Sequence, residues 1–177
     1  MEGVIDASTK TALALGYKNM KFIKTDLEEY NHQGKNPTLC ISLHACDIAT
    51  DYALFAAIKS RANAILCVPC CHRELLAENY EIEALSGNVL KHNALKEKFS
   101  AIFTESLRML LLESCGYKTS ITEYVSPLDT PKNLLIKAVY NGNRKEKENA
   151  KDEYLKLKEL CRCNITLGKL LEEEGII

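Results

Sequence analysis

Apolar and polar positions follow one another along the chain in two different patterns. Short continuous apolar runs predict strands, whereas segments with an apolar residue every three or four positions predict helices that bury one side. The expected strands lie at 21–24, 38–43, 64–68, 117–125 and 134–140, and the expected helices at 3–15, 48–60, 94–114, 144–158 and 167–174. Strands that alternate with helices in this way are typical of an α/β fold.

The strands also predict how the sheet is built. Residues 38–43 and 64–68 are apolar enough to be buried on both faces, as in a parallel sheet. The last two strands are separated by a short segment with the turn-forming sequence Asp129-Thr130-Pro131, which predicts an antiparallel end. We therefore expect a mostly parallel sheet with an antiparallel edge strand, followed by C-terminal helices.

Glycine, proline and one aspartate mark the ends of these elements. Gly16 and Gly116 follow predicted helices, where the left-handed backbone of a helix C-terminus favours glycine. Pro69 ends the strand at 64–68, because proline donates no hydrogen bond to a neighbouring strand. Asp47 directly precedes the helix at 48–60, and we expect it to cap that helix by accepting an N–H from its first turn.

Composition narrows the class of protein. A length of 177 residues fits a domain of ordinary size, and 23 basic against 24 acidic residues give a net charge of −1. This balance argues against a polyanion-binding surface over the whole domain, although a local basic patch still allows RNA binding. The first ten residues lack the features of a signal peptide, and the longest apolar run is too short to cross a bilayer. We expect a cytoplasmic protein that does not enter the membrane.

Polar and nucleophilic side chains follow three of the predicted strands. Asp26 comes after the first strand, residues 43–47 end the second, and residues 68–72 end the third. In open α/β sheets, ligands bind beyond the carboxyl ends of the strands, so these segments are the expected site. Asp26 and Asp47 have a structural alternative as caps of the following turns. His44 has one as a core histidine, although its place at a strand end favours function.

The eight cysteines raise two further alternatives. Without an export signal they are expected to be reduced thiols rather than a disulfide framework. The sequence Cys67-x-x-Cys70-Cys71-His72 suggests zinc or thiol-redox chemistry, but structural zinc needs four convergent ligands and this chain has one such pair. Pro69 also lies between the two thiols, which is unlike a redox motif. We therefore predict no metal ligands, and we expect Cys40, Cys67 and Cys115 to be small core residues.

Four short motifs in order carry a resemblance to a known family. They are LHACD at 43–47, ATD at 49–51, VPCCH at 68–72 and TPKN at 130–133. This combination resembles one branch of the class I S-adenosylmethionine (SAM)-dependent methyltransferases. The branch includes the methyltransferase-like 25 and ribosomal RNA adenine dimethylase domain-containing proteins. The resemblance covers nearly all of residues 4–140, and the tail helices also fit it.

The resemblance implies a fold and a cofactor. The chain would be the C-terminal part of a Rossmann-like methyltransferase fold, with a partial domain at 1–142 and a helical extension at 143–177 that packs on it. The cofactor would be SAM, and the product S-adenosylhomocysteine (SAH) would bind in the same place. Asp26 and Leu27 would contact the adenine, while His44 and Ala45 would face the methionine part.

The resemblance also implies an acceptor pocket. Methyl transfer is an in-line displacement, so alignment in a dry pocket supplies most of the rate, and a base is needed only where the acceptor must lose a proton. The acceptor is unidentified, and RNA is one class that the family suggests. The residues assigned to catalysis or to the acceptor pocket are His44, Cys46, Asp47, Pro69, Cys70, Cys71 and His72, with Lys132 and Asn133 at the rim.

One part of the family's pattern does not occur in this sequence. Family members have a Gly-rich loop and an acidic residue ahead of the segment that matches here, and no Gly-x-Gly sequence replaces that loop. We therefore expect a truncated methyltransferase that binds SAM weakly at best. The strand at 38–43 would present an open apolar edge and favour homo-oligomers. The alternative function is a non-catalytic remnant that acts as a binding or oligomerisation module.

Overall fold

The computed structural model describes residues 2–77, 90–130 and 132–177. Residues Met1–Tyr30 form one compact unit and Asn31–Ile177 another. The first unit holds helix α1 (Glu2–Ala14), which confirms the predicted helix. Gly16 ends it with φ 84°, and the Tyr17 N–H donates to the Ala12 carbonyl at 2.9 Å.

The predicted strand at 21–24 is wrong. These residues carry no strand and join no ladder with another part of the described chain. A strand is held by hydrogen bonds to a neighbouring strand, and a run of four residues without such a partner has nothing to fix it in the extended form. The same segment exposes Ile23, whose side chain is 67% accessible.

The second unit is built on a four-stranded sheet with the order β1-β2-β4-β3. Its strands are β1 (Leu39–Leu43), β2 (Ala64–Val68), β3 (Tyr117–Glu123) and β4 (Leu134–Tyr140). β1 and β2 are parallel, whereas β4 is antiparallel to both β2 and β3. The mixed α/β class is therefore confirmed. The antiparallel strand, however, lies inside the sheet and not at its edge as predicted.

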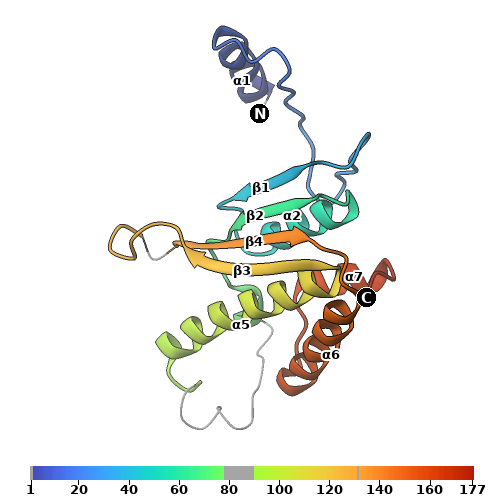
Figure 1. The fold of residues 1–177 in the computed structure, drawn as a ribbon. Helices are drawn as coiled ribbons and strands as arrows, with labels where there is room; N and C mark the ends of the chain where they lie inside the picture. Colours follow the sequence, from blue (N-terminus) through green and yellow to red (C-terminus); the bar gives the residue numbers. More distant parts are fainter. Residues whose placement is uncertain (1, 78–89, 131) are drawn as a thin grey trace. The chain divides into compact units, whose positions relative to one another are not determined.

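The position of β4 follows from the connection that precedes it. The chain reverses direction between β3 and β4, and β4 then pairs along its whole length with β3 while its other side meets β2. β3 consequently runs in the same direction as β1 and β2. The carboxyl ends of these three strands meet at one edge of the sheet, at the left of Figure 1.

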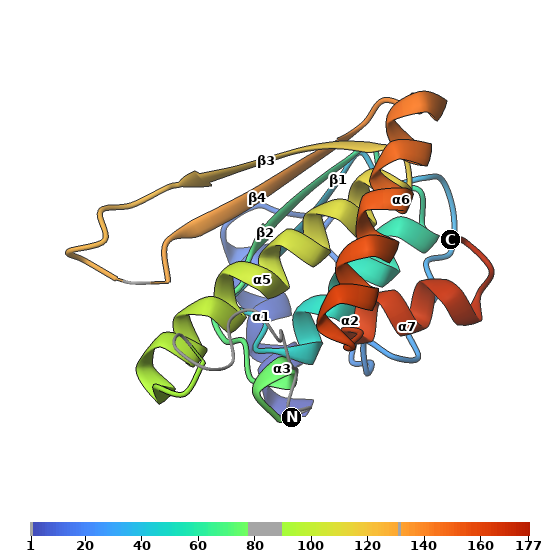
Figure 2. The same ribbon diagram turned by 90° about the horizontal axis from the view of Figure 1, so that it is seen from below.

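The helices of the second unit cover one face of this sheet, as Figures 1 and 2 show together. The helix predictions at 48–60, 94–114, 144–158 and 167–174 are confirmed within a few residues. Helices α2, α5 and α7 enclose the core against β2 and β4, with Leu54, Leu107, Ile136 and Leu171 fully buried. The helices are α2 (Ile48–Lys59), α3 (Glu74–Ala77), α5 (Asn93–Ser114), α6 (Arg144–Cys161) and α7 (Thr166–Glu173). None of the described helices is long and apolar enough to cross a membrane.

Strand β1 is an edge strand with one exposed apolar face. Leu39, Ile41 and Leu43 alternate with half-buried residues and are 45%, 59% and 64% accessible. The prediction that this strand is buried on both faces is therefore wrong, because the helices of this unit cover only the other face. The predicted open apolar edge agrees with the order of the described sheet, in which β1 pairs only with β2.

Helix α5 buries a different face from the one its apolar residues suggest. Phe103, Leu107 and Leu111 are buried as expected, but Ile102 is 66% accessible. The inner side of the helix instead includes Arg108 and Glu105, which are almost completely buried. The long helix therefore carries charged groups into the interior, beneath the edge at which the strands end.

Candidate functional site

Two loops lie next to each other where β1 and β2 end. Residues 44–47 follow β1, and residues 69–73 follow β2; we call them the strand-end loops. The parallel register places Leu43 beside Val68, and the His44 N–H donates to the Val68 carbonyl at 2.9 Å. The structure thus brings together the predicted residues of both loops, His44 to Asp47 and Pro69 to His72.

Three thiols converge between the strand-end loops. The sulfur of Cys46 lies 3.0 Å from that of Cys70, which in turn lies 3.7 Å from the sulfur of Cys71. All three sulfurs are within 4.8 Å of one another. Cys46 is exposed, Cys71 is half-buried and Cys70 is buried. We call these three residues the thiol cluster.

Contacts within the thiol cluster shift the pKa values of Cys46 and Cys70 in opposite directions. Hydrogen bonds with Cys70 and then Cys71 lower the pKa of Cys46, and the charge of Arg73 acts in the same direction. The same contact with Cys46, together with burial, raises the pKa of Cys70 to about 12. Cys46 therefore ionises before Cys70, and it is also the most exposed thiol of the cluster.

Asp47 does not cap helix α2, so that prediction is wrong. Its backbone has φ 54° and its carboxylate accepts hydrogen bonds from the N–H groups of Arg73 at 2.9 Å and Glu74 at 3.1 Å. Those two amides begin the short helix α3. Asp47 thus joins the two strand-end loops, because one loop supplies the carboxylate and the other the amide donors.

Beneath the loops lies a set of buried charges, which we call the charge network: Asp51, His72, Glu105 and Arg108. The Arg108 guanidinium donates to both oxygens of Asp51, at 3.0 and 2.9 Å, and to Glu105 at 3.2 Å. It also donates to the backbone carbonyl of Asp47 at 3.0 Å. His72 Nε2 contacts the same oxygen of Glu105. The network therefore ties helices α2 and α5 to both strand-end loops.

Burial and charge shift the pKa values of Arg108 and Asp51 in opposing ways. Burial alone would lower the pKa of Arg108, but the carboxylates of Asp51 and Glu105 reverse that effect and raise it. Burial raises the pKa of Asp51, while Arg108 opposes the rise. Among the described residues, the Oε2 atom of Glu105 has no hydrogen-bond partner although it is buried. Apart from this oxygen, the buried polar atoms of the network therefore have hydrogen-bond partners within the described residues.

The two histidines of the loops differ in exposure. His44 is exposed and adopts φ 56°, so it is not a core histidine. Its carbonyl accepts weak hydrogen bonds from the thiols of Cys46 and Cys70, at 3.9 and 3.7 Å. The His72 side chain is only 10% accessible and is engaged by Glu105. Of the two predicted bases, His44 is the one open to a ligand.

The remaining predicted residues lie farther along the same edge or in the other unit. Lys132 is exposed, whereas Asn133 is buried and donates to the Val125 carbonyl at 2.9 Å, so its amide shapes the loop between β3 and β4. Pro131 lies outside the described residues. Asp26 and Leu27 are exposed residues of the first unit, whereas the strand-end loops belong to the second.

Sequence reasoning missed two members of the charge network. Glu105 and Arg108 lie on a helix whose apolar residues predict a core-facing side, and Arg108 stands three residues before Leu111 on that side. A charged residue at such a position is the signal, since isolated buried charges are strongly unfavourable. Asp51, four residues after the predicted cap at Asp47, was noted only as part of the ATD motif.

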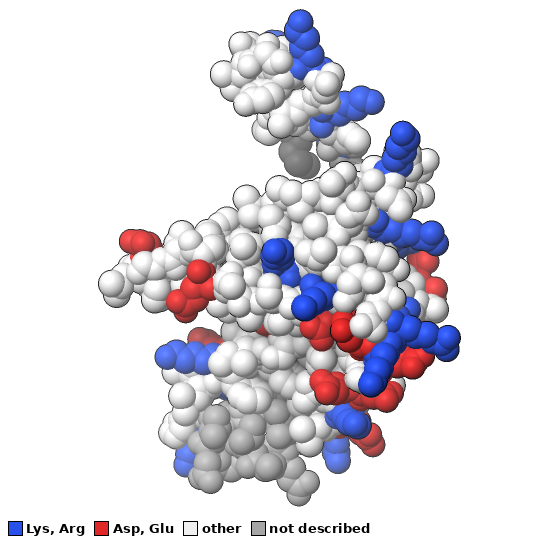
Figure 3. All heavy atoms as spheres, in the orientation of Figure 1, with Lys and Arg blue, Asp and Glu red and all other residues white. Residues whose placement is uncertain are grey.

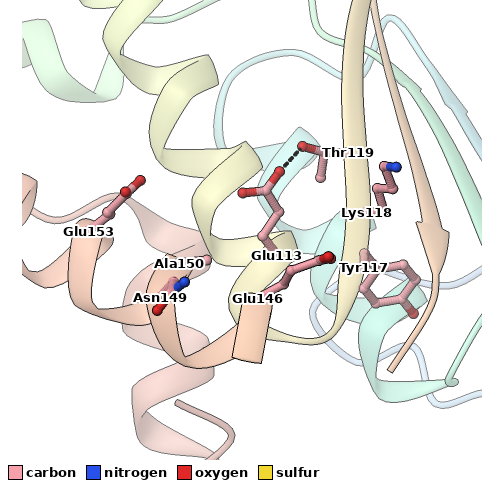
Figure 4. Close-up of a pocket in the computed structure, with 8 residues that line it drawn as sticks. All are labelled: Glu113, Tyr117, Lys118, Thr119, Glu146, Asn149, Ala150 and Glu153. Atoms are coloured by element: carbon pink, nitrogen blue, oxygen red, sulfur yellow. Dashed lines mark hydrogen bonds between the residues drawn. The ribbon is translucent and has the colours of Figure 1, made fainter. Parts of the chain in front are cut away.

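A hollow lies at the opposite end of the sheet, where β3 begins (Figure 4). It has a volume of about 330 Å³ and lies between the end of α5, the start of β3 and the start of α6. Glu113 accepts a hydrogen bond from Thr119 at 2.5 Å, and Glu146 accepts from Asn141 and Asn143. Two of its three carboxylates, Glu113 and Glu146, therefore serve local structure, and the polar strand-end loops remain the candidate site.

The charges on the surface of the second unit are mixed. On the face drawn in Figure 3, its Lys and Arg side chains are interspersed with Asp and Glu, and the sheet itself contributes mostly uncharged surface. This agrees with the near-neutral net charge of −1. A binding surface for RNA on this face would therefore rest on a few local cations.

Comparison with known proteins relates the first part of the chain to a protein family. Residues 1–78 match a family described as "Methyltransferase domain", a match that includes β1, α2, β2 and both strand-end loops. This supports a methyltransferase family and methyl transfer in general. A segment of 58 residues is 36% identical to the Homo sapiens and Macaca fascicularis proteins described as "Glutathione S-transferase C-terminal domain-containing protein". It covers 33% of this chain and 8% of each relative. No solved structure matches the chain.

Proposed function

We propose that this chain belongs to a SAM-dependent methyltransferase, in the branch whose motifs it resembles. The observation that carries the proposal is the match of residues 1–78 to a methyltransferase domain, because that segment contains the strand-end loops. A mixed sheet with helices packed on it is consistent with such a fold. The strand-end loops occupy the edge at which α/β sheets bind their ligands.

The residues present fit part of the cofactor. SAM carries a methyl group on a positively charged sulfonium, which supplies the group to be transferred. His44 is exposed and Ala45 half-buried, so the loop after β1 has free surface for the methionine part. The Gly-rich turn that would cradle the methionine end of the cofactor in the family does not occur in this sequence. The fit is therefore confined to the side of the methionine part that faces His44 and to the acceptor side.

The chain's own residues would orient the acceptor and handle a proton. His44 is the exposed side chain beside the proposed methyl position and would hold or accept the acceptor's proton. The charge network would hold the loop geometry from beneath, since Arg108 binds the Asp47 carbonyl and Glu105 binds His72. The acceptor is a base- or amine-bearing molecule, and RNA is the class that the resemblance favours.

Calorimetric titration with SAH tests the proposal. We expect the chain to bind SAH, and His44→Ala to weaken that binding at least tenfold, which is about 1.4 kcal/mol. Asp152→Ala is the control, because Asp152 is exposed on α6 in a different part of the chain. The proposal fails if SAH does not bind, or if the control lowers the affinity as much as His44→Ala does.

The exposed face of β1 favours a second candidate function, a non-catalytic module that binds another copy of the chain. Leu39, Ile41 and Leu43 present a row of apolar side chains on a strand with one free edge. Exposed apolar edge strands pair readily with other strands.

Light scattering after gel filtration tests this second function. A dimer that Ile41→Lys converts to a monomer would support the module, with Ile102→Lys as the control. Ile102 has a similar accessibility, 66% against 59%, but lies on helix α5. A monomer at all concentrations would exclude association through β1.

A further inference from the structure

We propose that Cys46, Cys70 and Cys71 form a binding site for a thiophilic metal ion, with Zn²⁺ as the ion that fits best. The site goes beyond the proposed methyl transfer, and it differs from the zinc motif that the sequence suggests. That motif contains Cys67, whose side chain is completely buried in β2 and faces the core. The structure instead pairs Cys70 with Cys46, which lies on the other strand-end loop and 24 residues earlier in the sequence.

The distances between the sulfurs suit coordination. Two thiolates bound to one zinc ion at about 2.3 Å lie about 3.8 Å apart in a tetrahedral arrangement. Cys70 and Cys71 already lie 3.7 Å apart. The Cys46 sulfur, at 3.0 Å from Cys70, must move outward by about 0.8 Å to reach this spacing. Cys46 is exposed, so its side chain borders solvent into which the sulfur can move.

The two loops that carry the thiols are held in place on each side of them. On one side, the His44 N–H binds the Val68 carbonyl at 2.9 Å as a continuation of the β1–β2 pairing. On the other side, the Asp47 carboxylate binds the N–H groups of Arg73 and Glu74. A ligand set held by such contacts loses little conformational entropy when the metal binds.

The surrounding contacts support the site from beneath and leave one coordination position open. The charge network binds the backbone or side chain of both loops, through the Asp47 carbonyl and through His72. Three thiolates and Zn²⁺ carry a net charge of −1, which the neighbouring Arg73 cation offsets. Zinc sites with three protein ligands complete their tetrahedron with water or a substrate atom. Because Cys46 is exposed, water has access to the site and can supply that fourth ligand.

A disulfide is the competing chemistry for the same residues. A bond between Cys46 and Cys70 requires the sulfurs to close from 3.0 Å to about 2.05 Å, and it requires an oxidant. It would leave Cys71 without a role, whereas a metal uses all three thiols. Metal binding needs only the loss of the thiol protons to solvent. The convergence of three sulfurs therefore favours the metal.

Metal titration of the reduced full-length chain tests the proposal. Protein treated with a phosphine reductant and stripped by a chelator is titrated with Zn²⁺ in competition with a chromophoric chelator. We expect about one zinc ion per chain, retained through gel filtration. Titration with Co²⁺ instead should produce thiolate-to-cobalt charge-transfer absorption in the near ultraviolet, which identifies sulfur as the ligand.

Single cysteine variants locate the metal. Cys46→Ser and Cys71→Ser should each weaken zinc binding at least tenfold and reduce the cobalt charge-transfer band. Neither residue is buried, so both variants should keep the circular dichroism of the parent. Cys115→Ser is the matched control, because Cys115 is also a half-buried free thiol but lies at the end of α5, at the other end of the sheet.

Three results would overturn the inference. The first is no zinc retained by the reduced chain. The second is unchanged binding by Cys46→Ser. The third is a Cys46–Cys70 disulfide in the untreated protein with no metal uptake after reduction. Because the readouts are metal content and cobalt absorption, these failures are separate from a failure of the SAH titration.

Discussion

The thiol cluster and the charge network lie one above the other at the same edge of the sheet, yet they differ in how far their groups are satisfied. Arg108 is completely buried and donates to Asp51, Glu105 and the Asp47 carbonyl. Cys46 is exposed, and its sulfur has only the weak hydrogen bonds that thiols make. The network therefore holds the loops in place, while the cluster remains available to a ligand.

This difference separates residues that stabilise the loops from residues that react. Removing a charge from the network leaves its buried partners unpaired, which is expensive in free energy. Removing an exposed thiol leaves no buried charge without its partner. Stability and reactivity should therefore respond to opposite sets of substitutions, and five measurements test that separation.

The largest effect is expected in thiol reactivity. Cys46 is exposed and has a lowered pKa, whereas burial raises the pKa of Cys67 to about 12. An upward shift of that size reduces the thiolate fraction about a thousandfold relative to an ordinary thiol at neutral pH. Iodoacetamide should therefore label Cys46 at least a thousandfold faster than Cys67 in metal-free protein, as measured by peptide mass spectrometry.

The pH dependence of this labelling has a defined sign. Because the pKa of Cys46 is lowered, its alkylation should persist at lower pH than that of Cys70, whose pKa is raised to about 12. Replacement of Cys70 by alanine removes the main hydrogen bond and should move the Cys46 profile to higher pH. An unchanged profile would contradict the contact between the two sulfurs.

The charge network should give the largest change in stability. Arg108→Met leaves Asp51 and Glu105 buried without their cation, which should lower the free energy of unfolding by about 3–5 kcal/mol. Urea denaturation measures it. Arg144→Met is the matched control, because the Arg144 side chain is 91% exposed and its ion pair with Glu148 should contribute less than about 1 kcal/mol. Equal effects would show that Arg108 is not buried.

Removing the contact between the two strand-end loops should have an intermediate effect on the free energy of unfolding. Asp47→Ala removes the acceptor for the Arg73 and Glu74 N–H groups and should cost about 1–2 kcal/mol, a typical value for a lost cap. Asp47→Asn keeps an oxygen acceptor and should lose less than half of that. If Asp47 capped α2 instead, the loss would appear as reduced helix content in circular dichroism rather than as increased protease sensitivity near residue 73.

The smallest change in the free energy of unfolding is expected for a substitution in the thiol cluster. Cys46→Ser should change the free energy of unfolding of metal-free protein by no more than about 0.5 kcal/mol, because the side chain is exposed. Cys67→Ser, its buried counterpart, places a hydroxyl in the core and should cost about 1–3 kcal/mol. A large loss for Cys46→Ser would mean that the thiol cluster is part of the packing.

Several elements were predictable because their signals are local. The helix at 94–114 and the strand at 134–140 rest on apolar spacing, and the ends at Gly16 and Pro69 rest on backbone constraints of single residues. The strand at 21–24 was predicted and does not form, because a strand needs a partner that its own residues do not specify. The direction and place of β4 also depend on pairing between distant segments.

By itself, the sequence determined which chemistry-bearing residues follow the strands, including His44, Cys46, Asp47 and the run from Cys70 to His72. It determined this because strands and the residues that end them are recognisable from local pattern. Only the tertiary structure decided that Cys46, and not Cys67, joins Cys70 and Cys71, and that Asp47 serves the neighbouring loop. The physical reason is that side chains distant in the sequence meet through strand register and through buried charges such as Arg108, which no local pattern encodes.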